Sequence, residues 1–316
     1  MEVWQTQAIK LHKEGVSWRK IARLLSVPKS TVSDFLRDRR VELDSKTKIL
    51  VFDIETAPMV VYVWSLWDKF IPIDNVIEDW SVLTWSAKWL GSPRMMNAMV
   101  GTSDPRDDFD VCERLWQLLD EADIVIGHNS DRFDIKKMNT RFLLHGLPEP
   151  SPYRSVDTLK IAKRKFNFSS NKLDYIAKIT GGEGKVKHEG MPMWIKCLAG
   201  NQTSLDEMQH YNDGDVLEQE RVYIKLRGWD HLHASVSVLT DNEEITCPVC
   251  GGNELEATGG HSYTQVGMFA TYRCQEPTCR KISKSRVSEK TVHKKPTLGC
   301  GVVTDKGRRG IFVPML

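Results

Sequence analysis

Short apolar runs rich in β-branched residues alternate with amphipathic segments between about residues 47 and 230. The runs have the length and composition of strands, and they lie at 49–54, 81–89, 95–100 and 124–126. Apolar positions recur at helical spacing in five further segments, at 109–120, 131–145, 156–163, 172–179 and 205–226. Strands that come first, then a strand–helix unit and more helices, predict an α/β domain with a mixed sheet.

The first 40 residues show a different pattern, which predicts a small all-α module. Helical segments at 18–25 and 29–37 flank a turn at 26–28. Small and apolar residues fall where such helices pack together, at Ala22, Val27, Val32 and Phe35. The segment resembles the homeodomain-like helix-turn-helix of resolvases and transposases. That resemblance implies DNA binding through groove-facing side chains, which here are Lys29, Ser30, Thr31 and Ser33. A trihelical module for protein contact is the alternative.

Charge is distributed unevenly along the chain of 316 residues, whose formal net charge is +2. Residues 1–40 carry nine Lys and Arg against four Asp and Glu, and residues 280–316 carry ten against two. The intervening residues carry 25 basic and 36 acidic side chains. Basic ends around an acidic centre favour a polyanion that the flanks hold and that metal-binding carboxylates process. Solvated tails on an acidic enzyme would give the same distribution.

Cysteine spacing predicts a metal site near the C-terminus. Cys247 and Cys250 form one close pair, and Cys274 and Cys279 form another. Paired cysteines in a chain without a secretory signal favour metal ligation over disulfides. Four thiolates at these spacings resemble a zinc ribbon, a small β module with one structural Zn²⁺, although the second pair is wider than usual.

These composition shifts divide the chain into five parts. We expect a helix-turn-helix at 1–40, a linker at 41–46, an α/β domain at 47–230, a zinc ribbon at 241–285 and a basic tail at 286–316. No apolar run approaches the roughly 20 residues that span a bilayer. The N-terminus also lacks the basic and apolar regions of a secretory signal. We therefore expect a cytoplasmic protein without a membrane partner.

Acidic residues occur in three ordered motifs within the α/β domain. Asp53 and Glu55 end an apolar strand, where alternation puts both carboxylates on one face, so that a divalent cation would relieve their repulsion. Asp134 lies on the first turn of a helix that follows a buried strand, and ligands gather at the carboxyl ends of such strands. Asp131 is its local competitor. In the long last helix, Tyr211 and Asp215 are four residues apart and share one face. His210 is an alternative to Tyr211.

Together the three motifs resemble the DEDD (DnaQ-like) exonuclease superfamily over about residues 47–228. Asp53-x-Glu55, Asn129-x3-Phe133-Asp134 and Tyr211-x3-Asp215 follow one another as in its tyrosine type. The motifs are most similar to those of family-B DNA polymerase proofreading domains and of YprB-type ribonuclease H-like proteins. No polymerase domain follows them, which implies a stand-alone nuclease.

The resemblance implies a ribonuclease H-like fold and removal of nucleotides from a 3′ end with two Mg²⁺ or Mn²⁺ ions. Asp53 would bridge both ions, Glu55 and Asp215 would hold the ion that activates water, and Asp134 would support the other. Tyr211 would orient the nucleophilic water, and Asn129 and Phe133 would contact nucleic acid. DNA is the favoured substrate, in a bacterial or phage-infected cell, with replication or recombination proteins as partners. A transposon-type endonuclease and a DNA-binding regulator with a non-catalytic core are the alternatives.

Two further patterns allow a structural or a binding interpretation. Five tryptophans between 64 and 89 could stack unpaired bases, but core and strand packing is the favoured interpretation. The segment 185–188 could contact phosphate, but a solvated loop is favoured.

Overall fold

The computed structural model describes residues 3–13, 16, 18–38, 47–67, 70–239, 245–264 and 267–291. The expected linker at 41–46 and the expected basic tail beyond residue 291 lie outside these ranges. Within the described residues, no helix is both long enough and apolar enough to span a bilayer.

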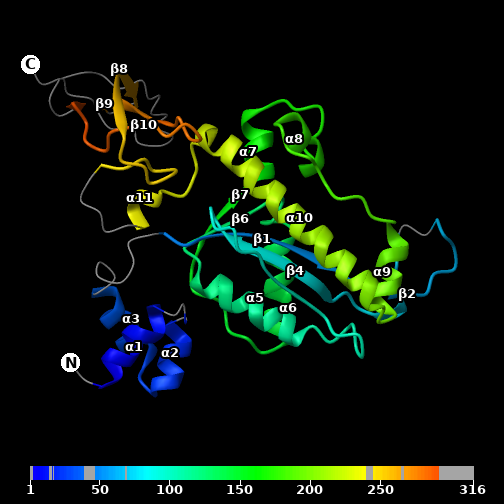
Figure 1. Cartoon of the computed structure of the whole chain (residues 1–316). Coiled ribbons are helices and arrows are strands. Elements are labelled where there is room, and N and C mark those ends of the chain that lie inside the picture. Colours follow the sequence, from blue (N-terminus) through cyan, green and yellow to red (C-terminus); the bar gives the residue numbers. More distant parts are fainter. Residues whose placement is uncertain are drawn as a thin grey trace, which may run out of the picture.

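A five-stranded mixed sheet forms the centre of the molecule (Figure 1). Its order is β5 (Met96–Met99), β4 (Val82–Trp89), β1 (Ile49–Thr56), β6 (Ile124–Gly127) and β7 (Arg154–Asp157). The central strand β1 runs antiparallel to β4 and parallel to β6. The expected mixed α/β sheet with flanking helices is thereby confirmed.

Side-chain alternation along β1 divides the core into two clusters. Leu50, Phe52 and Ile54 pack in one cluster with apolar residues of α5 (Phe109–Glu121) and α6 (Asp134–Leu144). Ile49 and Val51 pack in the other cluster. That second cluster includes residues of α7 (Thr158–Lys165), α8 (Leu173–Ile179) and the long α10 (Gln202–Leu226). Residues 53 and 55 continue the alternation of 49 and 51, so they face α10.

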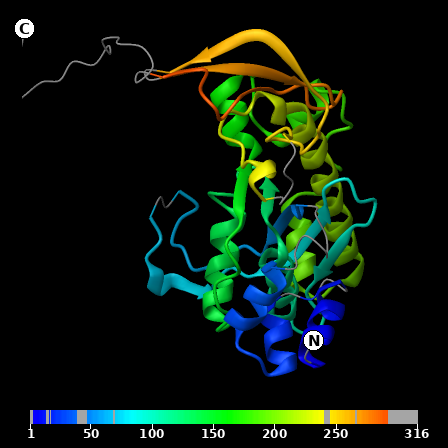
Figure 2. The same ribbon diagram turned by 90° about the vertical axis from the view of Figure 1, so that its left-hand side faces the viewer.

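The N-terminal module consists of α1 (Val3–Lys13), α2 (Trp18–Leu25) and α3 (Lys29–Asp38) around a small buried core. The C-terminal module consists of β8 (Leu255–Tyr263), β9 (Gly267–Cys274), β10 (Ile282–Lys284) and β11 (Lys290–Thr291). The two modules lie at opposite ends of the central domain (Figure 2).

The boundaries of several elements differ from the sequence prediction. The expected helix at 156–163 begins at Thr158, because residues 154–157 form the edge strand β7. The long helix begins at Gln202, three residues before the expected start, with Asn201 as its N-cap. Helix α9 (Met191–Leu198) and the short elements η1 (Ile73–Asn75), η2 (Arg227–Trp229) and α11 (Val236–Leu239) were not predicted.

A two-stranded hairpin, β2 (Val60–Val61) and β3 (Val76–Glu78), also escaped prediction. It follows β1 directly and extends away from the sheet (Figure 1). The favoured core interpretation holds for Trp85, which is 3% exposed, but it is wrong for Trp64, which is 99% exposed on this hairpin.

Candidate active site

Three carboxylates from two elements meet on the face of β1 that α10 covers. Asp53 and Glu55 come from the end of β1, and Asp215 comes from the middle of α10. One oxygen of each carboxylate lies within 4.8 Å of the corresponding oxygens of the other two. The structure therefore brings together three of the four acids that the sequence motifs single out.

Amide side chains of α10 hold Asp53 in place. Asn212 donates a hydrogen bond from Nδ2 to Oδ2 of Asp53 at 2.7 Å, and Gln219 donates from Nε2 to Oδ1 at 2.6 Å. Asn212, Asp215 and Gln219 follow each other at intervals of three and four residues, so they share one face of the helix. The same helical face thus supplies a carboxylate and positions another. Sequence reasoning missed both amides.

Asp134 lies beside this group at the first residue of α6. It is 3% exposed, and its Oδ1 accepts a hydrogen bond from the backbone N–H of Ile54 at 3.3 Å. That bond ties it to the strand between Asp53 and Glu55. The competing acid Asp131 instead pairs with Lys160 at 2.6 Å, away from the cluster.

A tight turn after β6 delivers Asp134 to this position. A Cβ on Gly127 would lie 2.4 Å from Cβ of Ser130, so no larger residue fits without a shift. Asn129 adopts a φ of 68°, and its backbone N–H donates to Oδ1 of Asp157 at 2.9 Å. Asparagine tolerates this left-handed conformation better than most residues.

Tyr211 is buried one helical turn before Asp215, and a lysine joins the two. Nζ of Lys185 donates to the Tyr211 hydroxyl at 2.8 Å and forms an ion pair with Oδ2 of Asp215. The backbone N–H of Lys185 donates to Oδ1 of Asp174 at 2.8 Å, which anchors its loop to α8. His210 is exposed. The solvated-loop interpretation is therefore wrong for Lys185. Gly181 and Gly182 indicate a tight loop in the sequence. They do not indicate that Lys185 contacts Tyr211 and Asp215.

Burial and mutual repulsion make negative charge costly at this site. Burial raises the pKa of Glu55 to about 8 and that of Asp134 to about 7. Burial, and then the charges of Asp134, Asp215 and Glu55, raise the pKa of Asp53 well above its usual range. Burial also raises the pKa of Asp215, which the neighbouring Lys185 opposes. A divalent cation would relieve this repulsion.

The donor set fits Mg²⁺ or Mn²⁺. All the acids offer hard oxygen ligands, which these ions prefer over sulfur or imidazole. In addition, Oδ1 of Asp215 is buried without a hydrogen-bond partner among the described residues. Buried polar atoms are normally satisfied, so an unpartnered carboxylate oxygen in an acidic cluster indicates room for a cation.

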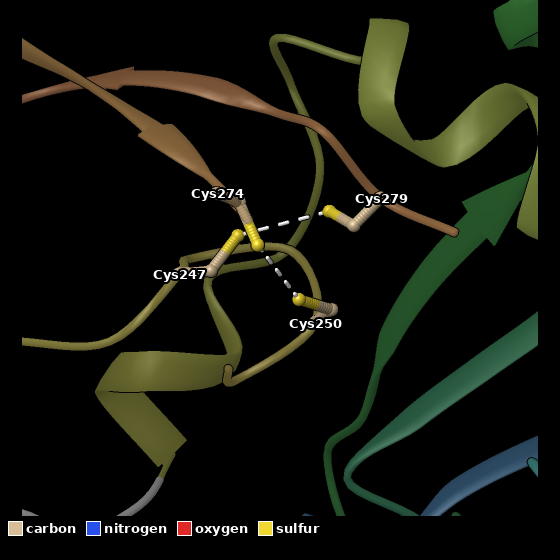
Figure 3. Close-up of side chains that lie close together, drawn as sticks. All are labelled: Cys247, Cys250, Cys274 and Cys279. Atoms are coloured by element: carbon tan, nitrogen blue, oxygen red, sulfur yellow. Dashed lines mark hydrogen bonds between the residues drawn. The ribbon is translucent and has the colours of Figure 1, made fainter. Parts of the chain in front are cut away.

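The four paired cysteines converge in the C-terminal module (Figure 3). Sγ of Cys247 lies 3.8 Å from Sγ of Cys279, and Sγ of Cys250 lies 3.6 Å from Sγ of Cys274. Tetrahedral coordination with Zn–S bonds of about 2.3 Å places sulfurs roughly 3.8 Å apart. The cluster is therefore compatible with one Zn²⁺.

The residues that we expect to contact nucleic acid lie in two places. Lys29, Ser30 and Thr31 are exposed on α3, whereas Oγ of Ser33 donates to the carbonyl oxygen of Ser30 at 2.8 Å. Phe133 is partly exposed next to Asp134. Asn129 borders a cleft of about 540 Å³ beside the carboxylates, together with His128, Lys163, Asn171, Lys172 and Lys185.

Comparisons with known proteins identify two domains. Residues 97–227 match the model of the RNase H superfamily, and residues 2–40 match the model of a homeodomain-like domain. The chain thus combines an N-terminal homeodomain-like helix-turn-helix with a ribonuclease H-like fold. The first match includes Asp134 and Asp215, and Asp53 and Glu55 precede it.

Among solved structures, the chain is similar to a family B DNA polymerase from the hyperthermophilic archaeon Pyrobaculum calidifontis. The two share 18% sequence identity with a TM-score of 0.43, over 58% of this chain and 25% of the polymerase chain. No curated protein matches the sequence.

Proposed function

We propose that this protein is a metal-dependent 3′–5′ exonuclease of the tyrosine type, which acts on DNA. The observation that carries the proposal is the convergence of Asp53, Glu55 and Asp215 within 4.8 Å, with Asp134 beside them. Four clustered acids, two of them buried, have little structural justification without a cation. The charges of Asp134, Asp215 and Glu55 raise the pKa of Asp53. The homeodomain-like domain favours DNA over RNA.

Each residue has a defined part in this proposal. Asp53 would contact both of two Mg²⁺ or Mn²⁺ ions, Glu55 and Asp215 would hold one of them, and Asp134 would support the other. Bound there, a pair of such ions activates water and stabilises the attacking and leaving oxygens of a phosphodiester. Asn212 and Gln219 fix the orientation of the Asp53 carboxylate through their hydrogen bonds.

Tyr211 and Lys185 complete the proposed site. The Tyr211 hydroxyl would orient the attacking water, and Lys185 fixes that hydroxyl by donating to it at 2.8 Å. The Lys185 ammonium also offsets negative charge on Asp215, with which it pairs. The cysteine cluster lies outside this site, and four thiolates would leave a Zn²⁺ no open position, so we assign its metal a structural role.

The test is hydrolysis of DNA and RNA labelled at the 5′ end, with Mg²⁺ or Mn²⁺. We expect ladders that shorten stepwise from the 3′ end and no product in EDTA. Asp53→Ala should abolish hydrolysis, since it removes the carboxylate shared by both ions. Asp131→Ala is the control, because Asp131 lies in the motif of Asp134 but pairs with Lys160 instead of joining the cluster. Full activity of Asp53→Ala, or cleavage of covalently closed circular DNA, would refute the exonuclease mechanism.

A further inference from the structure

The β2–β3 hairpin presents a large apolar surface to solvent. Trp64 is 99% exposed, Trp67 is 87% exposed and Phe70 is 83% exposed. Seven other exposed apolar side chains accompany them on the hairpin, namely Val60, Tyr62, Val63, Leu66, Ile71, Ile73 and Ile77. So many exposed apolar side chains on one short hairpin are unusual, and exposed apolar surface of this extent usually marks a binding site. We call residues 60–67 and 70–78 the aromatic hairpin.

The base of the aromatic hairpin is firmly attached to the central domain. Nη1 of Arg106 donates to the carbonyl oxygen of Asp79 at 2.8 Å, and Nη2 donates to that of Pro58 at 3.4 Å. Arg106 also forms an ion pair with Glu78. One guanidinium thus joins both ends of the hairpin and neutralises one of its acids, so the exposed aromatic rings project from a fixed base.

A row of aromatic and cationic side chains connects this base to the carboxylates. Nζ of Lys137 lies 3.8 Å from the ring centre of Trp80 and 5.3 Å from that of Phe133. Trp80 follows β3, and Phe133 precedes Asp134. Arg141 approaches the ring of Trp80 at 5.9 Å. An aromatic ring, a cation and a second ring therefore lead from the candidate active site to the hairpin.

The surroundings of this row are suited to a polyanion with flat apolar bases. Arg132 and Lys136 are exposed on either side of Phe133 and Asp134. Cations beside a backbone and aromatic rings beneath its bases are the two components of single-strand binding surfaces. The acidic exceptions are Asp79, near Lys137, and the hairpin residues Asp74 and Glu78, of which Glu78 pairs with Arg106. A protein partner would need neither the row of cations nor its continuity with the carboxylates.

We propose that the aromatic hairpin, with Trp80 and Lys137, is an accessory binding site for unpaired nucleic-acid bases outside the active site. Trp64 and Trp67 stack on bases distant from the reacting end, and Lys137 contacts the connecting phosphates. This site rests on the proposed function, because the strand that it holds is the substrate.

The test measures binding of the full chain to a fluorescently labelled single-stranded DNA oligonucleotide in EDTA, where hydrolysis does not interfere. Base stacking is worth about 1–3 kcal/mol per base. The double variant Trp64→Leu/Trp67→Leu, which keeps apolar bulk but removes the π faces, should weaken binding at least about tenfold. Trp64→Phe/Trp67→Phe should retain most of the affinity. Trp229→Ala is the matched control, because Trp229 is an exposed tryptophan of η2 at the far end of α10.

The outcomes separate this site from the proposed function. If the chain binds the oligonucleotide through the tryptophans but does not hydrolyse it with Mg²⁺ or Mn²⁺, the accessory site stands and the exonuclease proposal fails. If the leucine variant binds as the wild type does, the accessory site is refuted, whatever the hydrolysis. The site is equally refuted if the wild-type chain self-associates in solution and the leucine variant is monomeric, since the hairpin is then a contact between copies.

Discussion

Lys185 places one positive charge among carboxylates that repel each other. Its ammonium connects the Tyr211 hydroxyl to the Asp215 carboxylate. Lysine suits this position because its compact ammonium can donate to two groups in different directions. Lys185 and Tyr211 therefore depend on each other. The lysine orients the phenol by donating to its hydroxyl, and the phenol oxygen accepts one hydrogen bond of the half-buried ammonium.

Substitutions at these two residues should lower hydrolysis non-additively. Tyr211→Phe and Lys185→Met should each reduce kcat about tenfold or more. Tyr211→Phe removes the water-orienting hydroxyl, and Lys185→Met removes the donor that holds this hydroxyl in place. The double variant should be little worse than the worse single variant, as expected for residues that act as a unit. Steady-state kinetics on a 5′-labelled oligonucleotide measures all three.

Two neighbouring residues provide the controls. His210→Ala tests the alternative histidine, and Lys187→Met removes an exposed lysine from the same loop. Both should stay close to wild type. A larger loss in His210→Ala than in Tyr211→Phe would assign the protein to the histidine type, and fully additive effects would show that Lys185 and Tyr211 act independently.

At the scale of single elements, the sequence predicts what depends on local periodicity. The buried strand at β6 and the helix at α5 were placed within one residue of their observed ends, because their apolar spacing reports burial directly. Strand β7 was merged into a helix, because its apolar residue Val156 continues the helical spacing of the segment that follows. The hairpin tryptophans were assigned to the core because hydrophobicity alone does not distinguish a packed ring from an exposed one.

The residues of the candidate site that belong to ordered sequence motifs could be predicted from the sequence. Asp53, Glu55 and Asp215 were singled out together, and the structure places them together. Asn212 and Gln219 were missed, since an amide that binds a carboxylate more than 150 positions away leaves no local pattern. Lys185 was missed because its loop is polar and glycine-rich, which is typical of solvated turns.

Helix α10 connects the candidate active site to the cysteine cluster. It carries Asp215 near its middle, and Arg227 directly after its end donates to Oγ1 of Thr278 at 2.9 Å. A Cβ on Gly228 would lie 2.2 Å from the carbonyl oxygen of Cys279, so the backbones meet closely. Lys281 adds a hydrogen bond to the carbonyl oxygen of Asp230 at 2.7 Å. The second cysteine pair therefore supports the end of this helix.

If the four cysteines hold Zn²⁺, its loss should loosen the end of α10. Cys279→Ser should abolish zinc binding, measured by metal analysis, because a small ribbon depends on its metal to fold. Hydrogen exchange in residues 219–229 should then accelerate, and hydrolysis should fall severalfold even with saturating Mg²⁺. Gly228→Ala should act in the same direction while zinc is retained. Cys300→Ser, which alters neither pair, is the control. Unchanged exchange in Cys279→Ser would show that the two parts are energetically independent.

At the scale of the whole molecule, side-chain contacts hold the helix-turn-helix against the central domain. Arg19 of α2 lies 3.7 Å from Oδ1 of Asp120 and over the ring of Trp116, both in α5. It also donates to the carbonyl oxygen of Glu149. These contacts use α2, so the residues exposed on α3 remain accessible to DNA. Held in this way, the basic module would present DNA to a domain whose own net charge is negative.

The clustered carboxylates make the stability of the whole molecule depend on pH. Glu55 has a folded pKa of about 8 against a usual value of 4.5. Between these values the folded protein retains a proton that the unfolded chain has released, so stability falls as pH rises through this window. The slope is at most about 1.4 kcal/mol per pH unit for each such group. A bound cation removes the repulsion, and it competes with protons for the same oxygens.

The melting temperature in EDTA should therefore decrease as pH rises from about 5 to about 8, and Glu55→Gln should reduce that decrease by removing the group that titrates. Added Mn²⁺ should raise the melting temperature of the wild type more at pH about 8 than at pH about 6, because fewer protons compete at the higher pH. Calorimetry of both proteins at matched ionic strength measures the two effects. A larger Mn²⁺ effect at the lower pH would contradict binding to these carboxylates. An equal effect in Asp53→Asn would place the ion elsewhere, because that variant keeps the size of the side chain but loses the central charge of the site.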